Sequence, residues 1–363
     1  MKKIIFTAYN LDVGGIERAL IALLHNINYD EYDVTLLLER KEGVFLNEVP
    51  SKVKIIEYKI SACKFVPIRK IINRLKLIKT ILKHKNKYDF ACCYAPYSIP
   101  GAILTKSFSK NNAIWIHSDY YYLYNKDTNR IKYFFDERGI NEFGHIIFVA
   151  EEAMNHFTKF YPNLNNLIVC NNLVNVDYIT KMANAPVEEI KPSKPLFINI
   201  CRHDEPAKKL TRLIEAADML KQANYDFEVW LIGNGPDTEV YLDLVDDLDI
   251  GDKVKIIGFR KNPYPYYKLA DAFVLTSNYE GFPVVYLESV IFNVPIITTI
   301  DVSGDGLKIK DNYGVIAEKN SADIFAKMKD FIDNGYDIKT PFDAGQYNNR
   351  IKNKIEHMFK NIW

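Results

Sequence analysis

The segment TSNYEGFPVVYLESV, residues 276–290, places two carboxylates eight residues apart around the expected start of a helix. Glu280 lies in the loop after an apolar strand, and Glu288 lies on the helix that follows. Pro283 is predicted to be the first helical residue, since its missing N–H would be unpaired there in any case. The backbone N–H groups of residues 281–284 and the helix dipole would attract phosphate or sugar oxygens, and the carboxylates would accept hydrogen bonds from hydroxyls. The segment therefore predicts a site for an elongated ligand that carries both kinds of group.

Two basic residues follow another expected strand and supply the positive charge that such a ligand needs. In NICRHDEPAKKL, residues 199–210, Arg202 stands just after the strand and Lys208 lies further along the loop. Arginine can bind a phosphate through two parallel N–H bonds, and lysine binds it as a point charge. Lys209 is an alternative to Lys208, and a set of solvated loop charges is the alternative to a site.

Glycines stand at the ends of other strands, where a backbone must turn sharply or approach a ligand. Gly14 and Gly15 separate the first strand from the first helix, and a glycine pair there lets backbone amides approach a phosphate. Gly233 and Gly235 lie in LIGNGPDTEV after a later strand, and Gly258 begins a GFR sequence after the next one. A tight turn without a ligand is the alternative explanation for these glycines.

The segment AIWIHSDYYYLYN, residues 113–125, ends an expected strand at His117. A side chain at the carboxyl end of a parallel strand faces the ligand-binding edge of the sheet. His117 is therefore expected to hydrogen-bond a hydroxyl or a phosphate, with a buried structural histidine as the alternative. Asp119 is predicted to position an acceptor. The tyrosine cluster of Tyr120, Tyr121, Tyr122 and Tyr124 would stack on acceptor sugars or lie at a lipid surface, with packing of the loop as the alternative.

Short apolar runs alternate with helical patterns along the chain, which is typical of a parallel sheet covered by helices. The stretch KMANAPVEEIKPSKP, residues 181–195, lacks periodicity and is the best candidate for a linker. Strands are expected at 3–7, 33–39, 53–56, 88–93, 113–117, 144–149, 196–200, 227–232, 254–257, 272–275 and 295–298, and helices at 66–86, 209–223, 236–248 and 283–292. The sequence therefore predicts an α/β protein with domains at 1–180 and 196–343, followed by a C-terminal helix at 344–363.

Glu-x7-Glu with GFP directly after the first glutamate resembles the signature of family-4 retaining glycosyltransferases of the GT-B fold, the group 1 glycosyl transferases of capsular and exopolysaccharide type. The resemblance continues in order through residues 199–216, 231–242 and 256–277 and covers nearly the whole chain. It implies two Rossmann-like domains whose parallel sheets face each other across a cleft, with the C-terminal helix returning to the first domain. Cys201 departs from the family's usual glycine, and the loop after it is one residue longer, which leaves Lys208 and Lys209 as competing assignments.

The family's site residues carry over to the matching positions of this sequence. Arg202 and Lys208 would hold the diphosphate, Glu280 would orient the transferred sugar, and Glu288 would hold the ribose hydroxyls. The resemblance thus implies catalytic roles for Glu280, His117, Arg202 and Lys208. It implies acceptor contacts for Asp119 and Tyr120, and donor contacts for Gly14, Gly15, Gly233, Gly258, Phe259, Arg260, Gly281, Phe282, Pro283, Val284 and Glu288.

The implied reaction is the transfer of a hexose or N-acetylhexosamine from a nucleotide diphosphate sugar, with UDP favoured. The anomeric configuration would be retained, and no metal or cofactor would take part. The acceptor would be a glycan or a lipid-linked sugar in cell-surface polysaccharide synthesis. Two alternatives stay open: a non-catalytic, glycosyltransferase-like partner subunit, and a sugar-nucleotide epimerase or phosphorylase with similar paired domains.

Residues 64–87 carry nine Lys and Arg and no acid, and Ile71, Leu75, Ile78 and Leu82 recur at helical spacing. A basic amphipathic helix of this kind can lie on an anionic membrane, unless its apolar face docks on the protein's own sheet. The chain has no recognised nucleic-acid motif, so nucleic acid is not an expected partner. Five cysteines without metal-ligand spacing, and the lack of a long apolar run, predict a cytoplasmic protein that can work at the inner face of the cell membrane.

Overall fold

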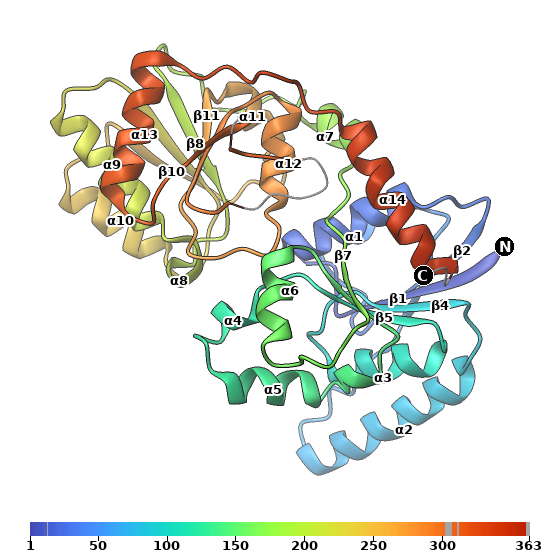
Figure 1. Ribbon diagram of the computed structural model, residues 1–363. Helices are drawn as coiled ribbons and strands as arrows, with labels where there is room; N and C mark the ends of the chain where they lie inside the picture. Colours follow the sequence, from blue (N-terminus) through green and yellow to red (C-terminus); the bar gives the residue numbers. More distant parts are fainter. Residues whose placement is uncertain (13, 302–306, 311, 361–363) are drawn as a thin grey trace. The chain divides into compact units, whose positions relative to one another are not determined.

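The computed structural model describes residues 1–12, 14–301, 307–310 and 312–360 (Figure 1). The chain divides into two compact units, and we describe each by itself. Unit 1 comprises Met1–Val174 together with the residues from Asn348 onward, and unit 2 comprises Asn175–Tyr347. The stretch 181–195 lies within unit 2. Each unit is built on a parallel sheet flanked by helices, which confirms the predicted α/β class.

The sheet of unit 1 has seven strands within the described residues, all parallel, in the order β3-β2-β1-β4-β5-β6-β7. The centre of the sheet is apolar on both faces, as expected where helices cover both. The strands are β1 (Lys2–Ala8), β2 (Tyr32–Leu38), β3 (Lys54–Glu57), β4 (Phe90–Cys93), β5 (Asn112–Ile116), β6 (His145–Phe148) and β7 (Leu167–Val169). The helices are α1 (Gly15–Asn26), α2 (Val66–His84), α3 (Ile99–Phe108), α4 (Tyr120–Leu123), α5 (Thr128–Asp136) and α6 (Glu151–Thr158), with short 3-10 turns at Leu46–Glu48 and Ile140–Glu142.

The C-terminal helix α14 (Ala344–Lys360) packs against unit 1, as the resemblance implies. Phe359 is buried, and its ring contacts the rings of Phe6 in β1, Tyr32 in β2 and Phe90 in β4. The side chain of Asn348 pairs with the backbone of Val174 through two hydrogen bonds, of 3.1 and 2.7 Å. The last helix therefore completes the core of the domain in which the chain begins.

The sheet of unit 2 has six strands within the described residues, also parallel, in the order β10-β9-β8-β11-β12-β13. The strands are β8 (Leu196–Ile200), β9 (Glu228–Ile232), β10 (Val254–Gly258), β11 (Ala272–Leu275), β12 (Ile296–Thr298) and β13 (Gly314–Ile316). The helices are α7 (Val176–Met182), α8 (Glu205–Lys208), α9 (Leu210–Gln222), α10 (Thr238–Asp247), α11 (Tyr264–Leu269), α12 (Val284–Ile291) and α13 (Ser321–Asn334).

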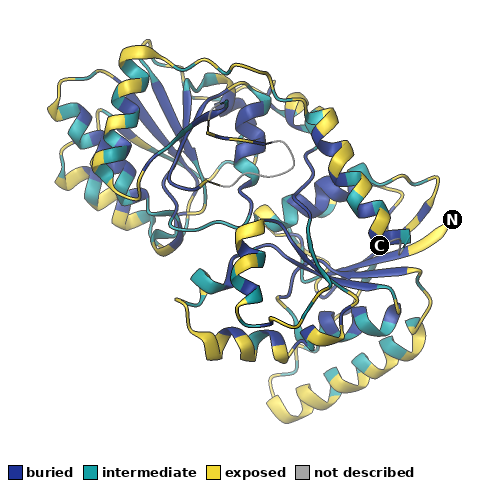
Figure 2. Cartoon of the chain, in the orientation of Figure 1, coloured by how far each residue is buried: buried dark blue, intermediate teal, exposed yellow. Residues whose placement is uncertain are grey.

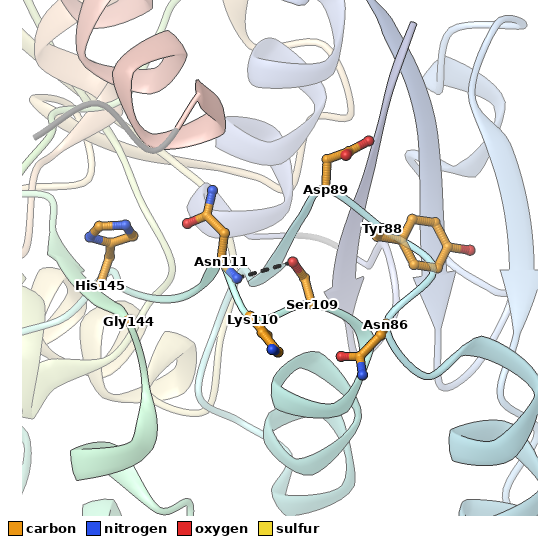
Figure 3. Close-up of a pocket in the computed structure, with 8 residues that line it drawn as sticks. All are labelled: Asn86, Tyr88, Asp89, Ser109, Lys110, Asn111, Gly144 and His145. Carbon is orange, nitrogen blue, oxygen red and sulfur yellow. Dashed lines mark hydrogen bonds between the residues drawn. The ribbon is translucent and has the colours of Figure 1, made fainter.

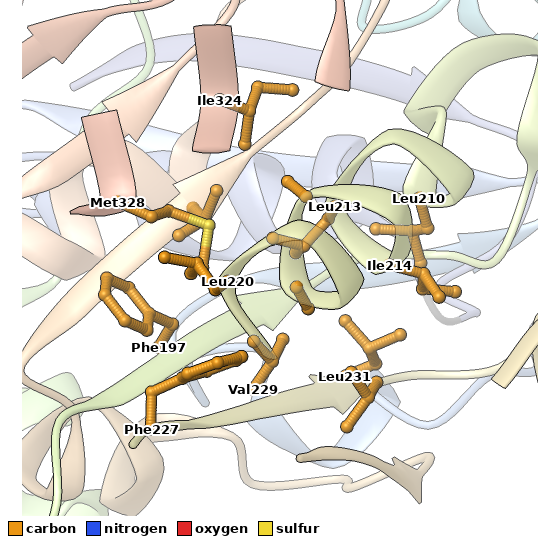
Figure 4. Packing of buried hydrophobic residues seen from close by; sticks show 14 of the residues in the cluster. Phe197, Leu210, Leu213, Ile214, Leu220, Phe227, Val229, Leu231, Ile324 and Met328 are labelled. Atoms are coloured by element: carbon orange, nitrogen blue, oxygen red, sulfur yellow. The ribbon is translucent and has the colours of Figure 1, made fainter. Parts of the chain in front are cut away.

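The core of unit 2 forms where helix α9 lies on the sheet (Figure 4). Leu210, Leu213 and Leu220 of α9 recur at helical spacing, and each is fully buried. They belong to the same cluster as Val229 of β9 and Met328 of α13. Burial of side chains of this size contributes roughly 1.5–3 kcal/mol each, so this layer holds the sheet and its loops in place.

Helix α2 is an exception, because none of its 19 residues is buried (Figure 2). It rests on α3 through the partly buried side chains of Leu77 and Ile81. Ile71, Leu75 and Leu82, by contrast, are exposed by 60, 62 and 73%. The helix therefore docks on its own domain through Leu77 and Ile81, while these three apolar side chains stay exposed. Within the described ranges, no helix combines the length and hydropathy needed to cross a membrane.

Candidate functional site

The predicted donor-binding residues of unit 2 follow the carboxyl ends of four parallel strands. Arg202 comes after β8, Gly233 after β9, Phe259 after β10 and Glu280 after β11. β8 and β11 are neighbours in the sheet. The chain continues from β8 to β9 on one side and from β11 to β12 on the other, so the two connections run in opposite directions. Ligands of open α/β sheets bind at such a switch point, because the loops that leave the two strands diverge there.

At this switch point the structure joins Lys208 to Glu280. The Nζ atom of Lys208 donates to Oε1 of Glu280 at 2.6 Å, and both side chains are largely buried. The hydroxyl of Ser277 donates to the same carboxylate oxygen, also at 2.6 Å. Burial alone would lower the pKa of Lys208, but the adjacent Glu280 carboxylate raises it above its usual value. A lysine that stays charged while partly desolvated is suited to an anionic ligand.

The other two cations of this loop are placed differently. Lys209 has a left-handed backbone conformation, with φ of 50°, and its Nζ atom pairs with Oε1 of Glu205 at 3.0 Å. Arg202 has a side chain that is 69% exposed, and its guanidinium pairs with Asp204. Of the two competing lysines, Lys208 is the one beside the signature glutamate.

Helix α12 begins one residue later than predicted. Pro283 is its N-cap and Val284 its first residue, so the prediction that Pro283 opens the helix is wrong by one position. Phe282 is buried and anchors the loop, while Gly281 and Val284 are partly exposed. The first N–H groups of a helix have no partner within it, so the predicted anion-attracting character of this segment is retained.

Glu288 lies on α12 and is only 6% exposed. Its Oε2 atom accepts a hydrogen bond from the hydroxyl of Tyr267 at 2.9 Å. Burial and the neighbouring Glu288 carboxylate raise the pKa of Tyr267 well above its usual value, so its hydroxyl keeps its proton. Sequence reasoning missed Tyr267, since only the packing of α11 against α12 brings it to a residue 21 positions away.

The glycine turn after β9 is required by the packing of two loops. At Gly233, φ is 150°, and a Cβ atom would lie 1.9 Å from the carbonyl oxygen of Cys201. At Gly235, a Cβ atom would lie 2.1 Å from the carbonyl oxygen of His203. These glycines therefore hold the loop that carries the diphosphate-binding candidates against its neighbour.

Arg260, predicted to lie near the nucleotide base, is engaged within unit 2. Its NH2 group pairs with Oε1 of Glu189 at 2.7 Å, and its Nε donates to the hydroxyl of Tyr266 at 2.8 Å. Phe259 is 41% exposed and Gly258 has φ of 82°. In this loop the aromatic ring of Phe259 therefore offers an accessible surface, whereas the guanidinium ties the 181–195 stretch to the sheet.

In unit 1, the Gly14–Gly15 pair lies at the start of α1, as predicted, and a carboxylate lies beside it. A Cβ atom at Gly14 would lie 2.1 Å from Oε2 of Glu17, so glycine leaves room for that side chain. Burial raises the pKa of Glu17. No motif in the sequence marks this acid, although a glutamate in the first turn of a helix is favoured by the helix dipole.

His117 follows the carboxyl end of β5 and is 7% exposed. Its ring lies 4.5 Å from that of Tyr94 and 5.8 Å from that of Trp115, measured between centroids. Burial lowers its pKa to about 3, against a weaker opposite effect of the Tyr94 backbone. No described residue forms a hydrogen bond of normal geometry with either ring nitrogen. The lowered pKa favours a neutral His117 at physiological pH, which suits a hydrogen-bonding role.

Asp119 and Tyr120, the predicted acceptor residues, are both buried. Asp119 caps α4 by accepting from the backbone N–H of Tyr121 at 3.0 Å, and its Oδ2 atom contacts Nδ1 of His156 at 2.7 Å. Burial raises the pKa of Asp119, and His156 opposes this. Tyr120 packs in an aromatic cluster with Phe134, so its ring has no face exposed for stacking on a sugar.

Asp119, His156 and Glu152 place ligand-type atoms within 4.8 Å of one another. Two of these atoms, Oδ2 of Asp119 and Nδ1 of His156, already contact each other at hydrogen-bond distance. This contact joins the N-cap of α4 to α6, and we assign no metal to the cluster.

A cavity of about 630 Å³ lies at the opposite edge of the unit 1 sheet (Figure 3). Its lining includes Asp89, Asn111 and His145, which stand at the amino ends of β4, β5 and β6. The predicted site residues all follow carboxyl ends, so this cavity is not the donor site.

Two Rossmann-like units with parallel sheets, and polar residues after the carboxyl ends of their strands, define a GT-B architecture. Solved structures share it. TarM of S. aureus, in a structure that contains UDP, has a TM-score of 0.75 at 14% identity and covers 99% of this chain and 100% of its own. HepE of Anabaena, in complex with UDP and glucose, has a TM-score of 0.74 at 15% identity, with 98% and 100% covered.

Residues 182–354 match the family described as Glycosyl transferases group 1. This range includes all the predicted site residues of unit 2, so the part of the chain that carries them matches the group 1 glycosyltransferases. An N-acetylgalactosamine-N,N'-diacetylbacillosaminyl-diphospho-undecaprenol 4-alpha-N-acetylgalactosaminyltransferase of Campylobacter jejuni is 24% identical over 92% of this chain and 91% of its own length. An uncharacterised glycosyltransferase of Methanocaldococcus jannaschii is 26% identical, but the match spans only 46% of this chain and 41% of that protein.

Proposed function

We propose that the protein transfers a hexose or N-acetylhexosamine from a nucleoside diphosphate sugar, with UDP as the favoured nucleotide, to a glycan or lipid-linked acceptor. The observation that carries this proposal is the contact between Lys208 and Glu280 at the switch point of the unit 2 sheet. UDP in the TarM and HepE structures supports the choice of nucleotide, and the name of the C. jejuni relative supports a lipid-linked acceptor.

In this proposal each donor group meets a chemically matched side chain. Lys208 and Arg202 neutralise the diphosphate, Glu280 accepts hydrogen bonds from the transferred sugar, and Glu288 accepts them from the ribose. As the bond between the anomeric carbon and the phosphate oxygen breaks, negative charge grows on the departing diphosphate. Cations placed beforehand in a partly desolvated site stabilise that charge most.

Retention of configuration is part of the proposal and follows the resemblance of the signature segment. The acceptor oxygen forms its bond on the side from which the diphosphate leaves, and the acceptor proton passes to a phosphate oxygen of the leaving group. The proposal includes no metal and no cofactor, and it assigns the neutralising role to the two cations above. The non-catalytic alternative is disfavoured because the lysine and both glutamates are present and held by defined contacts.

Binding of the donor can be tested by thermal stabilisation with UDP, GDP, ADP and their glucose and N-acetylglucosamine conjugates. A ligand at 100 times its dissociation constant adds about 2.7 kcal/mol of stability. We expect one nucleotide to stabilise the protein and Glu288→Gln and Arg202→Ala to reduce the effect. The exposed residues Glu318 and Lys339 of unit 2 supply matched controls, Glu318→Gln and Lys339→Ala, which should respond like the parent. Failure of every nucleotide to bind would overturn the proposal.

We also propose that α2 docks on an anionic membrane surface, where a lipid-linked acceptor would be found. The helix presents Ile71, Leu75 and Leu82 to solvent, and residues 64–87 carry nine basic residues and no acid. An apolar face flanked by cations matches the interface of a bilayer with acidic headgroups.

Sedimentation with lipid vesicles tests this second proposal. The parent should bind vesicles that contain phosphatidylglycerol more strongly than vesicles of phosphatidylcholine alone, and salt should weaken the binding. Leu75→Glu combined with Leu82→Glu should abolish binding, whereas Ile190→Glu, at an apolar residue 88% exposed outside α2, should not. Equal binding of all three proteins would exclude α2 as the contact.

A further inference from the structure

Tyr267 and Glu288 form a buried, hydrogen-bonded polar pair beside aromatic and aliphatic side chains. The ring of Tyr267 stacks on Phe292, with centroids 5.9 Å apart, and lies 5.8 Å from the ring of Phe273. On α12, Leu287, Ser289 and Val290 next to Glu288 are buried as well. A carboxylate and a hydroxyl in such a layer cost desolvation energy that apolar side chains of similar size would avoid.

The hydrogen bond between the two side chains has a definite direction. Because the raised pKa of Tyr267 keeps its hydroxyl protonated, that hydroxyl is the donor and Oε2 of Glu288 the acceptor. The bond therefore constrains the rotation of the carboxylate group.

We propose that Tyr267 is a positioning residue that makes Glu288 selective for a ribose, so that the donor site takes ribonucleoside diphosphates and discriminates against their 2′-deoxy forms. The inference rests on the proposed function, because it takes Glu288 as the acceptor of the ribose hydroxyl bonds. Tyr267 does not touch the nucleotide. It holds the carboxylate in the orientation in which those hydroxyls can donate.

The Tyr267→Phe variant isolates this role. Phenylalanine keeps the aromatic ring and its stacking on Phe292, and it removes only the hydroxyl that donates to Glu288. A matched control is Tyr286→Phe on α12 itself. Tyr286 is also fully buried, and its hydroxyl bonds to Thr298 and to the carbonyl of Ile300 rather than to Glu288.

The experiment is calorimetric titration of the parent and both variants with UDP and with 2′-deoxy-UDP. The parent should bind UDP at least about tenfold more tightly than the deoxy form, since a hydrogen bond to a charged group is lost. In Tyr267→Phe this preference should fall to about threefold or less, because UDP binding weakens while 2′-deoxy-UDP binding stays nearly unchanged. Tyr286→Phe should keep the preference of the parent.

Three results would overturn the inference. The preference could persist in Tyr267→Phe, both ligands could weaken equally in that variant, or the parent could bind UDP and its deoxy form alike. The second result would mean that Tyr267 serves only the fold, because a purely structural loss does not distinguish the two ligands. These outcomes differ from failure of the proposed function, in which the parent would bind none of the nucleotides on the panel.

Discussion

Acidification should destabilise unit 1 through His117, and the size of the effect follows from its burial. In the unfolded chain a histidine has an ordinary pKa of 6.5, whereas in the fold burial lowers the pKa of His117 to about 3. Below pH 6.5 His117 is protonated in the unfolded state but stays unprotonated in the folded state. The free energy of unfolding therefore falls as the pH falls toward 3. At pH 5, about 1.5 pH units below the unfolded value, this one group should cost about 2 kcal/mol of unfolding free energy relative to pH 8.

The assay is denaturant unfolding of the parent and of His117→Phe at several pH values between 8 and 5. Trp115, 5.8 Å from His117, supplies a local fluorescence signal. Subtracting the two profiles cancels the contributions of other titrating groups, and the difference should change by about 2 kcal/mol over this range. His117→Gln should show the same change despite a different absolute stability. A difference that is flat with pH would refute a neutral, buried His117 and reopen a role as a cation.

Three further predictions concern unit 2. Lys208→Ala should raise the Kd for UDP about tenfold to a hundredfold, because a charge-assisted hydrogen bond is lost. Lys209→Ala should change this Kd less than about threefold, and calorimetric titration of both variants shows which lysine binds the diphosphate. Ser277→Ala, which frees Glu280 from one of its donors, should lower kcat about tenfold with little change in the Kd for UDP, and an unchanged kcat would exclude a positioning role. Gly233→Ala should destabilise the protein by at least about 2 kcal/mol in denaturant unfolding because its Cβ meets the Cys201 carbonyl, whereas Gly251→Ala, with nothing within 4 Å of its Cβ, should be nearly neutral.

Much of the fold could be predicted because apolar periodicity reports directly on burial. The strands from β1 to β6 and from β8 to β12 were expected within one or two residues of where they lie. The expectation omitted β7 and β13, which are three residues long and mostly half-buried, so their pattern is too short to stand out. The position of the C-terminal helix in unit 1 came from the resemblance, since periodicity alone does not say which surface a helix covers.

The site residues that belong to a continuous sequence motif could be predicted. Glu280, Glu288 and the loop cations could be named because motif spacing places them after particular strands. Tyr267 could not, because it meets Glu288 only through the packing of two helices. The partner of Asp119, His156, was hidden for the same reason, whereas the packing of Tyr120 among aromatic rings of α5 was one of the two alternatives that the sequence left open.

The exposed face of α2 shows a different limit of sequence reasoning. Its apolar and basic residues were visible at once, but a helical pattern is the same whether the apolar face meets the protein or another surface. In the structure Leu77 and Ile81 pack against the domain, whereas Leu75 and Leu82 stay exposed, and the sequence pattern does not separate these two groups.

The most direct test of the central claim is a crystal structure of the protein with UDP bound. We predict that the diphosphate lies within hydrogen-bond distance of Lys208 and that a ribose hydroxyl contacts the carboxylate of Glu288. UDP bound elsewhere, for example in the cavity at the amino ends of β4, β5 and β6, with Lys208 still paired only to Glu280, would contradict the account.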